Sequence, residues 1–173
     1  TRLSHKFYQR DPVVLARALL GQVLVRVDMD GTRLAGRIVE TEAYLGVADR
    51  AAHSYGGRRT ARNAAMWGPA GHAYVYFVYG MHYCMNVVAE GPEQPSAVLL
   101  RALEPLDGLE QMRRRRTAGR AVVLPDEALC SGPAKLAQAL GVDRALDGAD
   151  LVDGETLFLE RGRRVPPARI VAA

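Results

Sequence analysis

Two carboxylates on a predicted strand are the first residues in this sequence that could do chemistry. In the segment RIVETEAYL, the two-residue period of a strand puts Glu40, Glu42 and Tyr44 on one face, and smaller or apolar residues on the other. Carboxylates that enter an apolar core unpaired cost free energy, so this face either meets solvent or lines a polar cleft. Spacing alone favours solvent, whereas carboxylates in a cleft could take part in acid–base chemistry.

An arginine interrupts a second apolar segment, AVLLRALE. Arg101 lies in a predicted strand that should be buried on at least one face, and Glu104 follows as a third carboxylate. An arginine in such a place usually pairs with a carboxylate, so a structural ion pair is the first interpretation. The alternative is an Arg–Glu pair that holds a water molecule between its two members.

The histidines and cysteines offer weaker signals. His53 opens a loop rich in Gly and Arg, and a lone histidine is usually a surface residue or a satisfied core residue. His72, His82 and Cys84 could in principle bind a metal, but they lack the usual spacing of metal ligands. We therefore expect no metal site, and nothing in the sequence indicates a cofactor.

Tyrosines gather in one short segment, YVYFVYGMHYCMN. The chain has seven tyrosines in 173 residues, and Tyr74, Tyr76, Tyr79 and Tyr83 are four of them. A core strand would be expected to use Val, Ile and Phe, because each buried phenol needs a hydrogen-bond partner. This pattern indicates that some of these rings have a task other than packing.

The elements that must position these residues can be predicted from local signals. Asp11 and Pro12 begin a helix that ends near Gly21, and Ser131 and Pro133 begin another that ends at Gly141. A third helix is predicted over residues 107–116, because acidic residues lie at its start and basic residues at its end. Strands are predicted at 22–28, 32–44, 73–79, 82–89, 96–105 and 155–162. The two tyrosine-rich strands turn at Gly80, and residues 53–63 form an exposed loop. We predict one α+β domain over residues 1–173, a mostly antiparallel sheet with helices around it.

Composition sets limits on the class of protein. The chain is 49% hydrophobic and 24% charged, and it has no apolar run near the roughly 20 residues of a membrane span. There is no signal-peptide pattern, and the two cysteines form no CxxC pair, so we expect a cytoplasmic, nucleoid-associated protein and a monomer. The chain begins at Thr1 without methionine, which suggests a trimmed N-terminus.

Charge is unevenly distributed along the chain. Residues 1–125 carry 17 basic and 11 acidic residues, while residues 126–160 carry two basic and eight acidic ones. Such asymmetry can mark a basic face that meets an anionic polymer. The alternative is a high-GC genome that uses arginine on a solvated surface, since only Lys6 and Lys135 are lysine.

Five ordered segments together resemble the alkyladenine (3-methyladenine) DNA glycosylase family, in the form of a bacterial member. They are RIVETEAYLG, AAHSYGGRRTARN, YVYFVYGMHYCMNVV, VLLRALEPLDGLEQMR and LCSGPAKLAQAL, and the resemblance runs from about Arg10 to Gly162. It implies a curved sheet or partial barrel like the C-terminal domain of methionyl-tRNA formyltransferase, with a protruding hairpin at about 74–88. In some family members a main-chain carbonyl beyond the final segment PPARIVAA helps to hold the water, so a C-terminus truncated at Ala173 would put activity in doubt.

The resemblance also implies a role for individual residues. Glu42 matches the general base that activates water, and Arg101 matches the arginine that helps to position it. Pocket residues that stack on or hydrogen-bond the extruded base match Tyr44, His53 and Tyr76, and Asn86 matches the asparagine that screens bases at the pocket wall. Tyr79 matches the tyrosine that intercalates into the DNA. Tyr74 and Tyr83 are then hairpin and core support, while Arg58, Arg59, Arg62 and residues 113–116 are candidates for contacts with the DNA backbone.

The implied reaction is monofunctional excision of damaged purines from double-stranded DNA. The substrates would be alkylated or deaminated purines of the 3-methyladenine, 7-methylguanine, hypoxanthine and ethenoadenine class, flipped out of the duplex and hydrolysed to leave an abasic site. A bifunctional glycosylase would need an amine nucleophile, and nothing places Lys6 or Lys135 near Glu42. A non-catalytic RNA-binding module is the main alternative. A zinc deaminase is disfavoured, because the chain lacks the H-x-E and P-C-x-x-C motifs.

Overall fold

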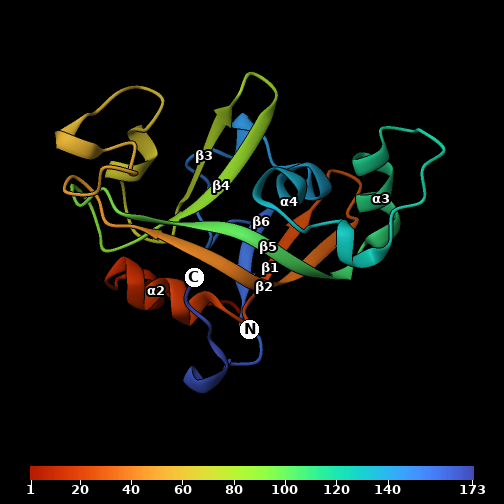
Figure 1. Cartoon of the computed structure of the whole chain (residues 1–173), viewed down its shortest axis with the longest axis horizontal. Helices are drawn as coiled ribbons and strands as arrows, with labels where there is room; N and C mark the ends of the chain where they lie inside the picture. Colours follow the sequence, from red (N-terminus) through yellow and green to blue (C-terminus); the bar gives the residue numbers. More distant parts are fainter.

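A computed structural model describes residues 1–173 as a six-stranded antiparallel sheet in the order β3-β4-β5-β2-β1-β6. The sheet curls into half of a barrel, and the β3–β4 hairpin stands away from it (Figure 1). This confirms the predicted α+β class with a curved, antiparallel sheet. The strands are β1 Val23–Val27, β2 Arg33–Tyr44, β3 Ala73–Val78, β4 His82–Val88, β5 Ala97–Asp107 and β6 Leu157–Glu160.

Short helices pack against the sheet. Helix α2 packs against β2 and β5, while α3 and α4 pack against each other and α4 also packs against β4 and β5 (Figure 1). The α-helices are α1 His5–Tyr8, α2 Pro12–Leu19, α3 Leu109–Thr117 and α4 Pro133–Leu140. The 3-10 helices are η1 Tyr55–Gly57, η2 Ala64–Trp67, η3 Asp126–Ala128, η4 Arg144–Leu146 and η5 Pro167–Arg169. None of the helices is long and apolar enough to cross a membrane.

Local signals placed the strands and the three longer α-helices, whereas α1, the 3-10 helices and the end of β5 were not predicted. The Asp11 carboxylate accepts hydrogen bonds from the backbone N–H groups of Val13 and Val14, so the predicted cap of α2 is confirmed. The prediction that the strand ends at Pro105 is wrong, because β5 continues to Asp107. Pro105 has no backbone N–H to donate to the ladder. It lies opposite Gly36, where the pairing of β2 and β5 is already irregular, so the strand continues past it at little cost in hydrogen bonds. The short α1 carries no strong signal and was not predicted.

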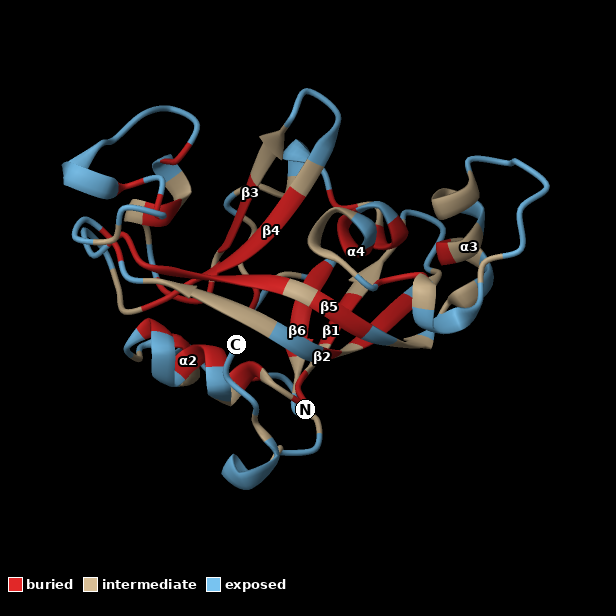
Figure 2. Ribbon diagram, viewed as in Figure 1, coloured by how far each residue is buried: buried red, intermediate tan, exposed pale blue.

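One large hydrophobic cluster joins the sheet to α2 and α4. Leu15 and Leu19 of α2 belong to it, as do Leu136 and Leu140 of α4, and all four are fully buried (Figure 2). Each buried leucine contributes roughly 1.5–3 kcal/mol to the free energy of unfolding. The central strands β2 and β5 are therefore held firmly by this cluster, which makes them a rigid base for a site.

Candidate active site

The floor of the candidate site is the place where β2 and β5 leave regular pairing. Register shifts fall on both strands, so that Val39 on β2 and Arg101 on β5 have no partner across the ladder. β-bulges of this kind re-aim side chains and are frequent next to active sites. Here the extra residue in β5 is the arginine that the sequence analysis singled out.

Arg101 joins the two glutamates predicted to share its face. Its Nε lies 2.8 Å from Oε1 of Glu40, and a terminal nitrogen lies 2.6 Å from Oε2 of Glu42. The bond to Glu40, opposed by partial burial and aided by the charge of Glu42, raises the pKa of Arg101. All three side chains are partly exposed, at 36% for Arg101, 57% for Glu40 and 42% for Glu42. The ion pair that was the first interpretation of Arg101 is therefore present, on a face that is open to solvent.

Glu104, the third carboxylate, lies away from this group. It forms an ion pair with Arg37, its partner across the β2–β5 ladder. The bulge at Val39 reverses the alternation between Arg37 and Glu40, so Arg37 and Glu104 stand on the same face as Glu40 and Glu42 but farther along the strands. Glu104 is thus engaged by Arg37, whereas Arg101 engages Glu40 and Glu42.

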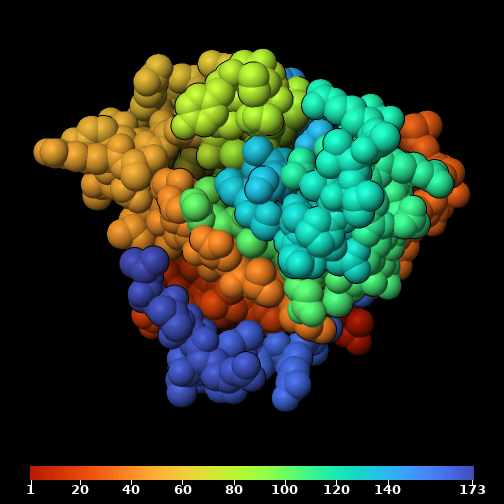
Figure 3. Space-filling view, turned by 45° about the vertical axis from the view of Figure 1, so that its right-hand side comes forward, coloured from red at the N-terminus to blue at the C-terminus, as the bar shows by residue number.

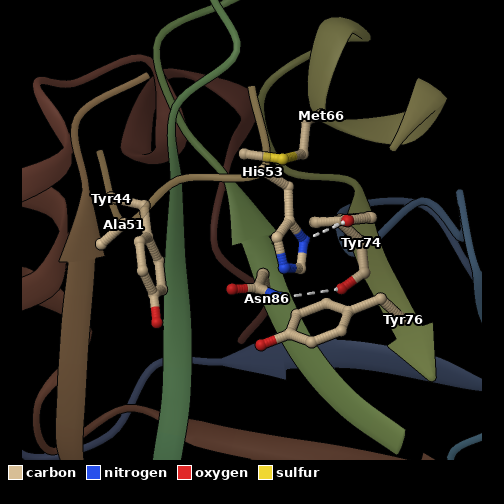
Figure 4. A pocket seen from close by; sticks show the side chains of 7 residues that line it. All are labelled: Tyr44, Ala51, His53, Met66, Tyr74, Tyr76 and Asn86. Atoms are coloured by element: carbon tan, nitrogen blue, oxygen red, sulfur yellow. Dashed lines mark hydrogen bonds between the residues drawn. The ribbon is translucent and has the colours of Figure 1, made fainter. Parts of the chain in front are cut away.

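A cavity with aromatic walls opens beside the glutamates, between the β3–β4 hairpin and the loop that follows β2. Its empty volume, which includes the opening to solvent, is about 240 Å³. All four residues assigned to base binding line it, together with three that were not: the lining residues are Tyr44, Ala51, His53, Met66, Tyr74, Tyr76 and Asn86 (Figure 4). Figure 3 shows the surface dipping between the hairpin and the loop of residues 50–65, which projects from the molecule. The sequence-based set therefore converges in space.

His53 occupies the middle of the cavity wall and is tied to the hairpin. Its Nδ1 lies 2.7 Å from the hydroxyl oxygen of Tyr74, and its ring meets that of Tyr76 edge to face, with centroids 4.5 Å apart (Figure 4). Partial burial and the nearby cations Arg58 and Arg62 lower the pKa of His53 below its ordinary value. A neutral imidazole is thereby favoured in the cavity at neutral pH.

The tyrosines of the cavity are held as neutral phenols. Burial raises the pKa of Tyr74 and of Tyr76, and for Tyr44 the neighbouring Glu42 carboxylate adds to the effect of burial. The Asn86 side chain is buried and donates through Nδ2 to the backbone carbonyl of Tyr74, 3.3 Å away. The cavity thus offers flat, electron-rich rings and a fixed amide without a net charge.

Two buried residues that the sequence analysis missed fasten the loop that carries His53. Asn63 donates to the backbone carbonyls of His53 and Arg58, at 3.1 and 2.9 Å, and accepts from the backbone N–H of Thr60 at 2.8 Å. The Ser54 hydroxyl donates to the carbonyl of Pro95, 2.9 Å away. Polar side chains in the polar motif HSYGGRRTARN are predicted to face solvent. Only the structure shows that Ser54 and Asn63 are buried, unlike most of their neighbours in the loop.

Tyr79 stands at the tip of the hairpin. Its side chain is 92% exposed, and its φ of 53° together with that of Gly80, 67°, places two consecutive residues in the left-handed region. Tight hairpin turns need such angles and usually use Asn, Asp or Gly for them. A tyrosine there costs on the order of 1–2 kcal/mol relative to an unstrained backbone, and it gains no packing in return.

The three arginines of the loop are all exposed, but they differ in their engagement. Arg59 forms an ion pair with Glu93 at 2.9 Å and lies over the ring of Trp67. Arg58 and Arg62 form no ion pair and no side-chain hydrogen bond, and both act on His53 electrostatically. Two cations at the mouth of the cavity therefore remain available to a partner.

The arginines of α3 are mostly used within the protein. Arg113 bonds Glu110 at 2.7 Å and also Asp126, Arg115 bonds Asp28 at 2.7 Å, and Arg116 donates to Gln138 at 2.7 Å. Only Arg114 is exposed without such a partner. Three of the four candidates for contacts with DNA phosphates are therefore engaged within the protein, where they brace α3 against its neighbours.

The residues considered for metal binding do not form a site. No group of three or more His, Cys, Asp or Glu side chains is arranged to hold a metal ion. Cys84 is buried on β4, which raises the pKa of its thiol, and His82 is exposed near the hairpin turn. His72 instead pairs with Asp150 through the backbone.

Comparison with known proteins agrees with this geometry. The family model described as Methylpurine-DNA glycosylase matches residues 6–173 of the chain. The DNA-3-methyladenine glycosylase of Homo sapiens is 54% identical over 181 residues, which cover 100% of this chain and 59% of the human protein. The protein of the same name from Mus musculus is 53% identical over 180 residues, which cover 99% of this chain and 53% of the mouse protein.

A bacterial relative matches over more of its own length. A protein of Clostridium acetobutylicum, named as a candidate 3-methyladenine DNA glycosylase, is 48% identical over 165 residues, or 94% of this chain and 80% of the clostridial protein. The chain thus spans more than half of the length of these mammalian relatives, and four fifths of this bacterial one.

Proposed function

Because the chain belongs to the methylpurine-DNA glycosylase family, we propose that it removes damaged purines from double-stranded DNA by hydrolysing the N-glycosidic bond and leaving an abasic site. The observation that carries this proposal is the position of Glu42. It is bonded to Arg101 and shares a strand face with Tyr44, which lines the aromatic cavity. A carboxylate therefore adjoins a pocket whose walls suit a flat ring.

The cavity is suited to a base that has left the duplex. A base within a duplex cannot be reached, so the enzyme flips it at a cost of a few kcal/mol. Stacking on an aromatic ring returns about 1–3 kcal/mol per base, and Tyr44 and Tyr76 supply such rings. Asn86, fixed by its bond to the hairpin backbone, screens the exocyclic groups of the base from a rigid position.

The wedge that fills the gap in the duplex is Tyr79. Its exposure and its strained backbone support this role, because strain without packing is often retained for function. Arg58 and Arg62 then meet phosphates on the strand that carries the damage. Arg59 can join them only by exchanging Glu93 for a phosphate.

Hydrolysis requires water delivered to C1′ of the sugar. Glu42 acts as the general base, with one oxygen bonded to Arg101 and the other turned to the water. Arg101 fixes the carboxylate and helps to position that water. A positioned base contributes roughly 10²–10⁴-fold to the rate.

Charge selects the substrate class. A purine alkylated at N3 or N7 is cationic and is a good leaving group, and electron-rich rings attract it more strongly than a neutral base. A neutral His53 avoids repelling such a cation. Hypoxanthine and ethenoadenine lack this charge, so they depend on stacking and on protonation of the leaving base.

The reaction is monofunctional, since neither lysine lines the cavity. Lys135 donates to the hydroxyl of Ser131 on the exposed side of α4, and Lys6 lies in α1. Without an amine nucleophile at the site, no Schiff base forms and the backbone is not cleaved. The product is a free base and an abasic site.

A mass-resolved assay of free bases tests this function. DNA carrying 3-methyladenine, 7-methylguanine, hypoxanthine or ethenoadenine is incubated with the protein, and the released bases are identified by mass. We expect release from at least one of these substrates and none from undamaged DNA. No release from any of them at stoichiometric protein would contradict the proposal and favour a non-catalytic nucleic-acid-binding module.

A further inference from the structure

A buried tyrosine in the cavity wall is bonded to the histidine of the same wall. Tyr74 is only 2% exposed, and its ring packs in a small hydrophobic cluster with Met66, Val88 and Ala97. Its hydroxyl has one polar partner in the protein, Nδ1 of His53 at 2.7 Å (Figure 4). Tyr74 therefore joins the core of the hairpin to the imidazole that faces the cavity.

The direction of this hydrogen bond follows from the burial of the hydroxyl. A phenol has one proton to donate, and a neutral imidazole has a proton on one nitrogen and a lone pair on the other. If Nδ1 of His53 held the proton and donated it, the phenol proton of Tyr74 would be buried without an acceptor, which costs free energy. If the phenol donates to Nδ1, its proton is satisfied. The imidazole proton then lies on Nε2.

The second ring nitrogen of His53 is free for a partner. Nε2 has no hydrogen bond within the protein, and Figure 4 shows it on an edge of the ring that is turned into the cavity. Partial burial and the cations Arg58 and Arg62 lower the pKa of His53, so the neutral ring is favoured at neutral pH. The groups that face it from the hairpin, Tyr74 and Tyr76, are neutral phenols. His53 thus presents one N–H donor to the cavity.

Both members of the pair are held by bonds to their backbone. Asn63 donates to the carbonyl of His53 at 3.1 Å, and Asn86 donates to the carbonyl of Tyr74 at 3.3 Å. The two rings stand nearly perpendicular, with 88° between their planes and centroids 6.0 Å apart. The direction in which Nε2 points is therefore set by contacts within the protein.

We propose that Tyr74 is a positioning residue for recognition of the flipped base: by donating to Nδ1 it keeps the proton of His53 on Nε2, where this proton is offered to a hydrogen-bond acceptor of the base. A ring nitrogen or a carbonyl oxygen can accept such a bond, whereas an exocyclic amino group cannot. A base without an acceptor at this place leaves the N–H unpaired and is disfavoured. The inference rests on the proposed function, since that function brings a base into the cavity.

Nitrogen NMR of the imidazole tests the tautomer in the DNA-free protein. The chain has four histidines, so the signals of His53 are assigned by their loss in His53→Gln. In the wild type at neutral pH we expect the chemical shift of a bare, hydrogen-bonded nitrogen at Nδ1 and that of a protonated nitrogen at Nε2. A proton on Nδ1 would overturn the proposal, and this result needs no substitution at Tyr74.

Tyr74→Phe keeps the ring and removes the donor. The imidazole of His53 should then populate both neutral tautomers and take up its second proton at a higher pH, because a bond donated to Nδ1 opposes protonation there. Tyr83→Phe is the matched control, since that ring packs on Phe77 in the same hairpin and its hydroxyl has no partner in the protein. It should leave the signals of His53 unchanged. Unchanged nitrogen shifts and an unchanged titration in Tyr74→Phe would overturn the proposal.

Binding of DNA tests the consequence for recognition. The measurement uses protein carrying Glu42→Gln, in which we expect a bound lesion to stay intact. Adding Tyr74→Phe should weaken binding of a duplex with hypoxanthine by roughly two- to tenfold, the effect of one neutral hydrogen bond, and should not change binding of a duplex with an abasic analogue. An equal loss with both duplexes would show that the effect does not come from the base, and it would overturn the proposal.

A double-mutant cycle shows whether Tyr74 acts through His53. The amide introduced by His53→Gln supplies an N–H donor that needs no phenol to place its proton. Tyr74→Phe should therefore weaken binding far less in the His53→Gln background than with His53 present, and equal effects in the two backgrounds would overturn the proposal. Base release tests the proposed function separately: a protein that releases bases while Nδ1 of His53 holds the proton would keep that function and lose this inference.

Discussion

The floor and the rim of the candidate site are built in opposite ways. On the floor, Arg101 holds Glu40 and Glu42 through short ion pairs on strands whose other face packs in the hydrophobic core. On the rim, Tyr79, Arg58 and Arg62 extend into solvent with no side-chain partner. The orientation of the floor residues is therefore fixed by contacts within the protein. The rim residues have no such contacts, so their orientation can be set by a bound partner.

The largest effect is expected on the floor, from Glu42→Gln. The amide keeps the size and the hydrogen bond of the carboxylate but loses its basicity, so single-turnover excision should fall by about 10²–10⁴-fold while lesion binding persists. Glu40→Gln is the matched control, because Glu40 also bonds Arg101 yet is farther along the strand from the cavity. Excision by Glu42→Gln within tenfold of the wild type would rule out Glu42 as the general base.

The next effect is expected at the tip of the hairpin. Tyr79→Ser should reduce excision of a paired lesion by an amount equivalent to a few kcal/mol, the cost of flipping without a wedge, and Tyr79→Phe should behave nearly as the wild type. The deficit should shrink when the lesion lies in a mismatch or a single strand. An equal deficit on paired, mismatched and single-stranded substrates would mean that the ring is not a wedge.

The free energy of unfolding gives a second test at Tyr79, on the rim of the site. Tyr79→Gly removes the strain of a positive φ without removing buried contacts, so it should raise the free energy of unfolding by about 1 kcal/mol while impairing excision. Thermal and denaturant unfolding measure the first effect. A loss of stability on this substitution would show that the side chain packs, in conflict with its exposure.

A smaller effect is expected from the loop arginines. Arg58→Gln with Arg62→Gln should lower the slope of log K against log salt by about 0.9 for each phosphate left without its arginine, and the unfolding free energy should not change. Arg114→Gln is the control, since that side chain is also exposed and unpartnered but lies on α3. An equal change of slope in the loop variant and in Arg114→Gln would mean that the loop arginines contact DNA no more than an exposed arginine of α3 does.

The smallest effect is expected from the pH dependence of His53. Its folded pKa is lowered, so the unfolded chain binds a proton more readily, and stability should fall as the pH drops below the ordinary histidine value of about 6.5. The effect should be small because the ring is half exposed. Melting temperatures at pH 7.5 and 5 compare the wild type with His53→Gln, and the wild type should lose more on acidification. An equal fall in melting temperature for the two proteins would contradict the inference that the fold keeps His53 neutral.

Sequence reasoning succeeded where the signal was local or periodic. The cap at Asp11 and the alternation that puts Glu40 and Glu42 on one face follow from short-range rules, and the structure confirms both. It failed where a side chain bonds a residue that is far away in the sequence. Arg115 bonds Asp28, 87 residues away, and nothing in the run of four arginines distinguishes that brace from a surface charge.

The cavity was predictable only in part for the same reason. Family resemblance supplied Tyr44, His53, Tyr76 and Asn86, but Met66 and Ala51 enter the wall because the loop folds back on the hairpin. That fold-back depends on the buried side chains of Asn63 and Ser54, whose polarity predicts exposure. Burial of a polar residue is decided by its partners, and those partners are known only once the tertiary structure is known.

The paired bulges in the floor limit how the length of this chain can change. Val39 is an extra residue in β2 and Arg101 is one in β5, so the ladder returns to the same frame beyond them. Deleting Val39 alone would carry Glu42 and Tyr44 to the wrong face, since a shift of one residue reverses every side chain. Deleting both extra residues would restore the frame but remove the guanidinium between the carboxylates. The length of the floor is therefore fixed by the register of its strands as well as by the chemistry of its side chains.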